Sequence, residues 1–517
     1  MPFETDPNPL LDAAALTRFD ALRPEHVTAA IDQLLAAARA TLAATAAATA
    51  AATWDNVVSP LEDATDRLAR AWYAVSHMNA VLDSPALRTQ YNANLPRVTA
   101  FWTELAQDTR LYARYCALAE SADFERWPAV NRKVIANALR DFHLGGANLA
   151  TGEQQRFSAL REQLARASAR FAENVLDSTQ HFELIVDDVR ALAGVPDDVL
   201  PMYRAAALAE GKPGHKITLH APSYMPILHY AHDRALRERV YRAYVTRASE
   251  FGRPEWDNGV LMVELLRARQ ELAALLGYRN YAQMSLVPKM AQDPGQVLEF
   301  LRELARHAKP HAEREMAELR GFAARELDLS DLQAWDVPYA SERLRQQRFD
   351  YSEQEVKQYF SERAVLGGLF RLIEMLFAVR ITPDQAATWH SDVRFYRIES
   401  PSGSLLGQFY LDLYARSHKQ GGAWHGSARG RRGDRGNDAT PVSFLTCNFT
   451  PPVAAHGQAA LTAPALLTHR EVVTLFHEFG HGLHHLLTRI DEPAVAGMHG
   501  VEWDAVELPS QFLENFA

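Results

Sequence analysis

The sequence predicts a mainly α-helical protein with a small β-sheet toward its carboxyl end. Through the first 390 residues, apolar side chains recur at steps of three and four, the period of helices buried along one face. The pattern then changes to short β-branched and aromatic runs, which are typical of strands. At 517 residues the chain is long for one compact core, so we expect more than one domain.

Three segments illustrate the helical part. Glu153–Val175 carries a single apolar stripe, and Val260–Leu276 repeats that pattern. The second segment is followed by Gly277, which suits the left-handed position after a helix. We expect Val297–Ala308 to end before Pro310, because the residue before a proline disfavours the helical conformation.

An Ala/Thr-rich run, Leu34–Thr53, is the one stretch that approaches a membrane span in length. It contains Arg39 and many threonines, and alanine is too weakly apolar to drive insertion, so we interpret it as a surface helix. The first nine residues have neither the basic nor the apolar region of a signal peptide. We therefore expect no membrane partner.

Charge and cysteine content restrict the class of protein further. A net charge of −10 argues against nucleic acid as a partner. Cys116 and Cys447 are the only cysteines, and two unclustered thiols suit a reducing cytosol. We expect a cytoplasmic protein.

The strand signals come late in the chain. Val393–Ile398 and Gln408–Tyr414 flank Ser400–Gly403 and predict a hairpin, and Val442–Phe449 predicts a third strand. Between the last two lies Gly421–Asn437, which we interpret as a solvated loop rather than a nucleic-acid contact. Its basic residues are Arg429, Arg431, Arg432 and Arg435.

The residues that carry chemistry follow this sheet, in Thr468–Thr488. His477 and His481 are four residues apart, so on a helix both imidazoles face one side and can bind one metal ion. Glu478 is the residue after His477, so it points in a different direction around the helix and would reach a water bound to that metal rather than the metal itself. Apolar residues cover the rest of the segment. A buried helix with two histidines and a glutamate favours a zinc site over a chance match.

Spacing leaves the third ligand open. The metzincin pattern requires a histidine where Leu487 stands, and two other zinc-peptidase spacings fall on Gly500 and Val501. Asp491 and Glu492 follow the helix too closely to fold back easily. Four carboxylates remain as candidates: Glu502, Asp504, Glu507 and Glu514.

Phe476–His481 followed by Val506–Asn515 resembles the thimet oligopeptidase family of zinc peptidases, and is most similar to its bacterial oligopeptidase A branch. Further similar stretches span nearly the whole chain: Ser76–Val81, Arg247–Ser249, Gly277–Tyr281, Phe409–Arg416, Gly421–Trp424 and Leu445–Phe449.

The resemblance implies that Glu507 is the third ligand of one zinc ion per chain. It also implies a zincin-like fold with two helical lobes around a deep channel, and a monomer that hydrolyses short unfolded peptides. We place the N-terminal helical lobe at residues 1–222 and the catalytic domain at 223–517. Glu478 would take the proton of the water and pass it to the leaving amine. A strand such as Phe409–Tyr414 would align the substrate by β-addition.

Other residues near the motif have less specific interpretations. A site with two histidines, a glutamate and a water is already tetrahedral, so His484 and His485 favour hydrogen-bonding or core roles over ligation. The loop Gly497–Gly500 resembles a substrate loop of the family, which makes His499 and Gly500 candidate substrate-binding residues. A plain surface turn explains that loop equally well.

The chain stops at Ser510–Ala517 without a helix terminator, so we expect the sequence to be truncated. Members of the family continue further and supply a tyrosine and a histidine to the oxyanion, so we expect little activity from this form. Two other functions stay open: a zinc hydrolase of a non-peptide amide, and a non-catalytic helical peptide-binding protein. The intact His-Glu-x-x-His motif argues against the latter.

Overall fold

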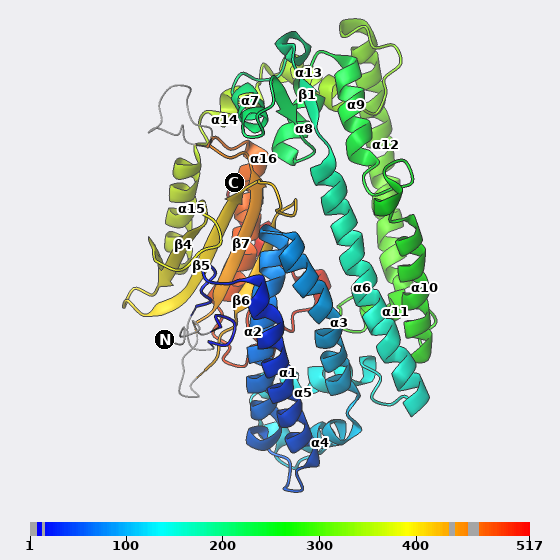
Figure 1. Ribbon diagram of the computed structural model, residues 1–517, viewed down its shortest axis with the longest axis vertical. Coiled ribbons are helices and arrows are strands. Elements are labelled where there is room, and N and C mark those ends of the chain that lie inside the picture. The colour runs from blue at the N-terminus through cyan, green and yellow to red at the C-terminus, as the bar shows by residue number, and fades with distance from the viewer. Residues whose placement is uncertain (1–7, 13–15, 434–439, 453–464) are drawn as a thin grey trace, which may run out of the picture.

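A computed structural model describes residues 8–12, 16–433, 440–452 and 465–517 and shows a mainly helical protein with a small mixed sheet (Figure 1). This confirms the predicted fold class at that level. The helices are α1 (Pro24–Ala47), α2 (Ser59–Val81), α3 (Pro85–Gln107), α4 (Thr109–Ala119), α5 (Ala129–Leu144), α6 (Thr151–His181), α7 (Leu200–Leu208), α8 (Ala221–Tyr230), α9 (Arg234–Val245), α10 (Gly259–Leu275), α11 (Tyr281–Leu286), α12 (Pro294–Glu326), α13 (Val337–Phe349), α14 (Glu353–Lys357), α15 (Glu362–Phe377), α16 (His469–Leu486) and α17 (Leu508–Glu514). The strands are β1 (Leu184–Val186), β2 (His215–Ile217), β3 (Arg380–Pro383), β4 (Arg394–Glu399), β5 (Leu405–Tyr414), β6 (Trp424–Arg429) and β7 (Val442–Phe449).

The main sheet has the strand order β3-β4-β5-β7-β6. β5 and β7 are parallel, and the other neighbouring pairs are antiparallel. The predicted hairpin is confirmed: β4 and β5 pair with Phe395 opposite Tyr410. β7 has the predicted bounds. The sequence did not predict the short β1–β2 sheet, because three-residue strands carry too little periodicity to detect.

Different parts of the chain bury the two faces of this sheet (Figure 1). Side chains alternate between faces along a strand, so Tyr410 points to one side while Phe409 and Leu411 point to the other. The first face packs against α1 to α3, and the second against α15 and α16. Among the residues in the first core are Phe19, Val75, Phe101 and Phe444; among those in the second are Leu369, Leu445, Phe476 and Phe479.

The helix predicted to end before Pro310 continues through it. α12 runs from Pro294 to Glu326 with Pro310 inside. A proline removes one backbone hydrogen bond, which is costly where the freed carbonyl is buried. Residues 301–315 are exposed, so water can donate a hydrogen bond to the carbonyl that Pro310 leaves without a backbone donor. The prediction was wrong because it applied the cost of a buried position to an exposed one.

The predicted loop Gly421–Asn437 is also partly wrong. Trp424–Arg429 forms β6, which pairs antiparallel with β7 and ends the sheet on that side; Arg435 and Asn437 lie outside the described residues. Glycine and arginine are weak strand signals, and pairing to β7 outweighs that weakness. The proposed substrate strand Phe409–Tyr414 lies in β5, between β4 and β7, so it has no free edge for β-addition.

The Ala/Thr-rich run lies largely in α1. In the described part of the chain this is the one helix long and apolar enough for a membrane span by length and composition, with a mean hydropathy of 1.2 in its window. It packs against α2 and α3, with Ile31, Leu35 and Ala38 buried. A core-facing helix passes the same test, so this feature is weak evidence for a span.

The predicted domain boundary at 222/223 stays a prediction. The core on the first sheet face contains residues from both sides of it, such as Val75 with Phe444. The N-terminal helices are therefore part of the support of the main sheet.

A buried charge network fastens α2 to this sheet. Asp412 of β5 accepts hydrogen bonds from Arg416 (2.7 and 2.8 Å), Lys419 Nζ (2.8 Å) and Trp389 Nε1 (2.9 Å). Arg416 also donates to the carbonyl of Val81 at the end of α2 (3.0 Å). Burial alone would raise the pKa of Asp412, but the hydrogen bond from Arg416 and the charge of Lys419 outweigh it and hold that pKa at about 2.

Replacing Asp412 by asparagine should lower the free energy of unfolding by about 3–5 kcal/mol, because the buried Lys419 and the partly buried Arg416 would lose their counter-charge. Urea denaturation at pH 7 measures the change. Glu104→Gln, which breaks an exposed pair with Arg39, is the control and should cost less than about 1 kcal/mol. Similar losses in both variants would contradict the role of the network.

Candidate metal centre

α16 presents the two predicted histidines on one face. A capping box between Thr468 and Glu471 fixes its start, and its apolar residues pack against the sheet. His477 and His481 are one helical turn apart, with ring centroids 5.0 Å apart. Because the opposite face of α16 is held by the core, both imidazoles must point away from the sheet.

The segment leading into α17 brings Glu507 to these two rings. Its Oε2 atom lies 3.2 Å from His477 Nε2 and 3.0 Å from His481 Nε2. Tetrahedral zinc ligands at about 2.0–2.1 Å from the metal lie roughly 3.3 Å from one another, so both distances suit ligands of one ion. All three donor atoms lie within 4.8 Å of one another. Among the described residues, no other set of three His, Cys, Asp or Glu ligands is gathered this closely.

The other candidate carboxylates lie elsewhere. Glu502 pairs with Lys133 at 3.1 Å. Asp504 accepts backbone hydrogen bonds from Met290 and Ala291, both at 2.9 Å. Of the four carboxylates that spacing left open, the structure therefore brings only Glu507 to the outward nitrogen of both histidines.

The fourth candidate, Glu514, contacts the other ring nitrogen of His477. Its Oε1 atom lies 2.6 Å from Nδ1, the ring nitrogen that faces away from Glu507. A carboxylate in this position fixes the orientation of a metal-binding imidazole. Spacing in the sequence indicated Glu514 only as a possible metal ligand and gave no prediction of this role. Glu514 follows Glu507 by seven residues, which is two turns of a helix and places both carboxylates on one face. This spacing was the signal from which the role could have been predicted.

Short-range packing between α16 and α17 sets the position of Glu507. The hydroxyl of Ser510 donates to Glu507 Oε2 at 2.9 Å and to its backbone carbonyl at 2.8 Å. Ser510 in turn lies against Gly480 of α16: a Cβ added to Gly480 would be 2.5 Å from the Cα of Ser510 and 2.6 Å from the carbonyl oxygen of Pro509. Only glycine permits this approach.

Glu478 is buried beside the two histidines. It is 6% exposed, and its Oε2 atom is buried without a hydrogen-bond partner among the described residues. Burial raises the pKa of its carboxyl to about 7, with His477 opposing and Glu507 adding to that rise. An ionised carboxylate here lacks the stabilisation that water would give it, so it has unused capacity to bind a proton.

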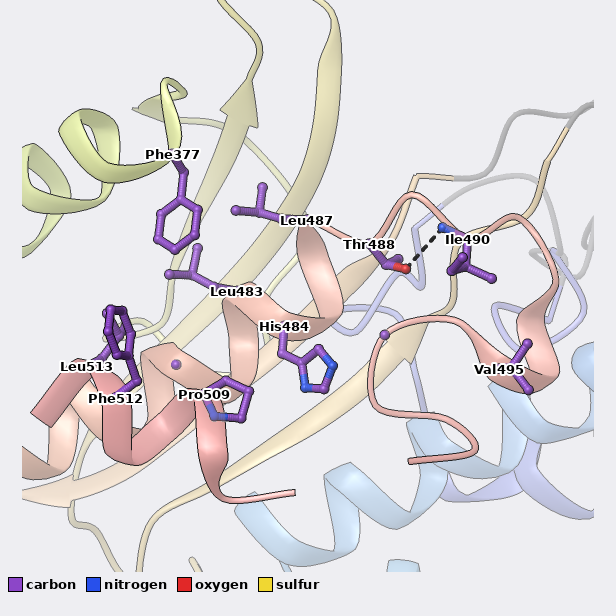
Figure 2. Close-up of a pocket in the computed structure, with 12 residues that line it drawn as sticks. Phe377, Leu483, His484, Leu487, Thr488, Ile490, Val495, Pro509, Phe512 and Leu513 are labelled. Carbon is purple, nitrogen blue, oxygen red and sulfur yellow. Dashed lines mark hydrogen bonds between the residues drawn. The ribbon is translucent and has the colours of Figure 1, made fainter. Parts of the chain in front are cut away.

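His485 and His484 are outside the three-residue group. His485 is fully buried, and its Nε2 atom lies 2.9 Å from the carbonyl oxygen of Arg429 and 3.2 Å from the hydroxyl of Ser427. Burial lowers its pKa to about 4, so at neutral pH it is an uncharged link between α16 and β6. His484 lies in a cavity of about 480 Å³ between α16 and α17, whose lining is mostly apolar (Figure 2).

The loop with His499 and Gly500 follows α16. The ring of His499 lies 6.1 Å from that of His485. Gly500 has a φ of +71°, and a Cβ there would come within 3.1 Å of the carbonyl oxygen of Ala494, so the turn requires glycine. A contact of His499 or Gly500 with substrate stays a prediction.

The fold and this site define a metallopeptidase of the His-Glu-x-x-His class. Residues 227–517 match peptidase family M3, and residues 31–155 match the N-terminal domain of neurolysin and thimet oligopeptidase. The chain belongs to peptidase family M3, whose members depend on zinc. It is a peptide-hydrolysing metalloendopeptidase, which sets aside the non-peptide amidase and the non-catalytic binding protein.

Curated relatives cover the chain almost completely. Oligopeptidase A of Haemophilus influenzae is 44% identical over 513 residues, which are 98% of this chain and 74% of that protein. Oligopeptidase A of Escherichia coli is 43% identical over 514 residues, with the same shares. A solved structure of PZ peptidase A matches with a TM-score of 0.54 at 15% identity, over 96% of this chain and 70% of that chain, and this likeness concerns the fold alone.

Replacing Glu507 by alanine should remove most of the bound zinc, because two neutral imidazoles alone hold the ion weakly. Glu502→Ala should keep the wild-type zinc content, and Glu514→Ala should lower zinc affinity about 10–100-fold by freeing the His477 ring. Elemental analysis and chelator competition measure both quantities. Zinc loss in the Glu502 variant with retention in the Glu507 variant would contradict the assignment.

Gly480→Ala should weaken zinc binding about tenfold or more, because the new Cβ would push Ser510 away from α16 and move Glu507 with it. Gly482→Ala is the matched control on the same helix. Its Cβ would meet only side-chain atoms of Leu445, the nearest at 3.0 Å, and no backbone of α17, so Glu507 would keep its position. Equal zinc affinities in the two variants would show that the α16–α17 approach does not position the ligand.

Proposed function

We propose that the protein hydrolyses short unfolded peptides with Glu478 as the general base, and that His477, His481 and Glu507 would hold one zinc ion per chain. The observation that carries this proposal is the position of one Glu507 oxygen at 3.0–3.2 Å from both outward imidazole nitrogens. Two histidines and one carboxylate are the ligand set of several catalytic zinc sites, which keep a fourth position open for water or substrate.

Each residue then has a definite task. A zinc ion at this position supplies Lewis acidity, which polarises a peptide carbonyl and makes a water easier to deprotonate. Glu478 takes the proton of the attacking water and returns it to the leaving amine, for which its partnerless Oε2 atom has the capacity. Glu514 holds the His477 ring, and Ser510 holds the carboxylate of Glu507. Burial of Glu478 limits competing protonation by bulk water.

A substrate that adds as a strand to the main sheet near α16 would pair with β6 rather than with β5. β6 is the terminal strand on that side, and it contacts α16. We propose further that the protein is a cytoplasmic monomer with no nucleic-acid or membrane partner. The free thiols of Cys116 and Cys447 support a reducing compartment, and the net charge of −10 argues against nucleic acid.

Glu478→Gln should retain zinc and lose at least about 100-fold in kcat, because the amide keeps the shape of the side chain but cannot accept a proton from water. Hydrolysis of a quenched fluorescent peptide is compared with wild type at equal zinc occupancy. Glu104→Gln, far from the site and exposed, serves as the control and should match wild type. A Glu478→Gln variant with wild-type turnover would remove this residue from the mechanism.

A further inference from the structure

A second, larger cavity lies at the N-terminal end of α16. It has a volume of about 650 Å³ and is enclosed by α8, α13 and α14 on one side and by the end of β7 and the first turns of α16 on the other. Arg470 and Thr474 of α16 line it. The predicted metal-site residues are not part of this lining.

Arg470 and Thr474 lie on the same face of α16 as the two histidines. The positions 470, 474, 477 and 481 follow steps of four, three and four, which place all of them along one side of a helix. At 1.5 Å per residue, Arg470 lies about 10 Å from His477 along the axis. An extended peptide rises about 3.3 Å per residue, so this separation corresponds to about three peptide residues.

The charges inside this cavity are paired, with one exception. Arg345 pairs with Glu342 and Glu353, and Lys357 Nζ lies 2.8 Å from Asp198. Glu471 accepts the backbone N–H of Thr468 at 2.7 Å. Within the described residues, the guanidinium of Arg470, an exposed residue at the mouth of the cavity, has neither a hydrogen bond nor an ion pair.

One further feature favours an anion beside Arg470. The first turn of α16 adds the positive end of its helix dipole, part of which the carboxylate of Glu471 already offsets through the capping box. At His229, across the cavity, burial lowers the pKa most; Glu342 and Glu353 oppose this, and Arg345 and Arg470 add smaller lowering effects. The charge of Arg470 is therefore felt at α8 on the far wall of the cavity, although the two carboxylates act more strongly there.

We propose that this cavity is a subsite for a carboxylate of the peptide substrate, bound by Arg470 about three residues from the scissile bond. The spacing to the metal site rests on the proposed function. A planar guanidinium binds a carboxylate through two parallel N–H···O bonds, which makes it selective for this group over an amide. The carboxylate can be the peptide C-terminus or the side chain of an aspartate or glutamate, and the chemistry is the same.

The test measures binding of labelled peptides by fluorescence anisotropy to the zinc-loaded Glu478→Gln protein, which should not consume them. A peptide of eight neutral residues is made in two forms, with a C-terminal amide and with a free C-terminal carboxylate. In a separate series, each position of the amide peptide is replaced in turn by Glu, with Gln at the same position as the control. Binding of a carboxylate at the favoured position should be about tenfold tighter than binding of its neutral counterpart. The free acid and the Glu series distinguish the two sources.

Arg470→Gln in this background should abolish that preference, and Arg470→Lys should keep part of it. Arg320→Gln removes one exposed positive charge from α12 and is the control for general electrostatics. Thermal unfolding and zinc content verify that each variant is folded and loaded. Equal losses in the Arg470→Gln and Arg320→Gln proteins, or no carboxylate preference before mutation, would overturn the proposal.

The subsite and the hydrolytic function can fail separately. If the protein with Glu478 intact cleaves no peptide while binding still depends on the carboxylate and on Arg470, the subsite stands and the proposed hydrolysis fails. If cleavage depends on Glu478 but acid and amide peptides bind alike, the hydrolytic site stands and the subsite is refuted.

Discussion

The approach of α17 to α16 at Gly480 is the constraint on which the rest of the site depends. The two histidines belong to one helix, but the carboxylates come from a segment some thirty residues later, which has to lie almost in backbone contact to reach them. A hydrogen at the Cα of residue 480, in place of any side chain, creates the space. Ser510, packed into that space, then orients Glu507 through its hydroxyl.

This contact is useful only because α16 itself cannot move. Its apolar face lies on the sheet with Phe476 and Phe479 in the core, and its partner α15 covers the same sheet face. The other face of the sheet is supported by α1 to α3, and the Asp412 network ties α2 to β5. The N-terminal third of the chain thus contributes to the metal site without supplying a residue to it, through a sheet that both regions bury.

The sequence predicted the elements whose signals are local. Helix α6 contains the whole predicted Glu153–Val175 stripe, and β7 has the predicted bounds, because one strong period runs through each segment. The predictions from sequence were wrong where the structure of a segment depends on the residues packed around it. Pro310 is tolerated because its helix is exposed, and β6 forms because β7 offers it a partner. Neither condition is visible in the segment itself.

The residues of the site likewise divide into those that local sequence signals predict and those that depend on the fold. The i, i+4 histidines need only helix geometry, and the sequence identified them directly. Glu507 could be separated from Glu502, Asp504 and Glu514 only by resemblance to a family, since the path of residues 487–507 has no local rule. The role of Glu514 needs the three-dimensional position of α17, which brings its carboxylate to a ring nitrogen 37 residues away in sequence.

The hydrogen bond between Glu514 and His477 also has a consequence for metal uptake. An ionised carboxylate can only accept, so the proton of a neutral His477 ring resides on Nδ1, and the lone pair of Nε2 is left facing Glu507. The ring is held in the tautomer that a metal needs before any metal arrives. Uptake of an ion by this ligand then requires no ring flip. Of the three ligands, Glu507 is the most exposed, at 51% against 25% for His477 and 9% for His481, so an ion from solvent meets the site on the side of the carboxylate.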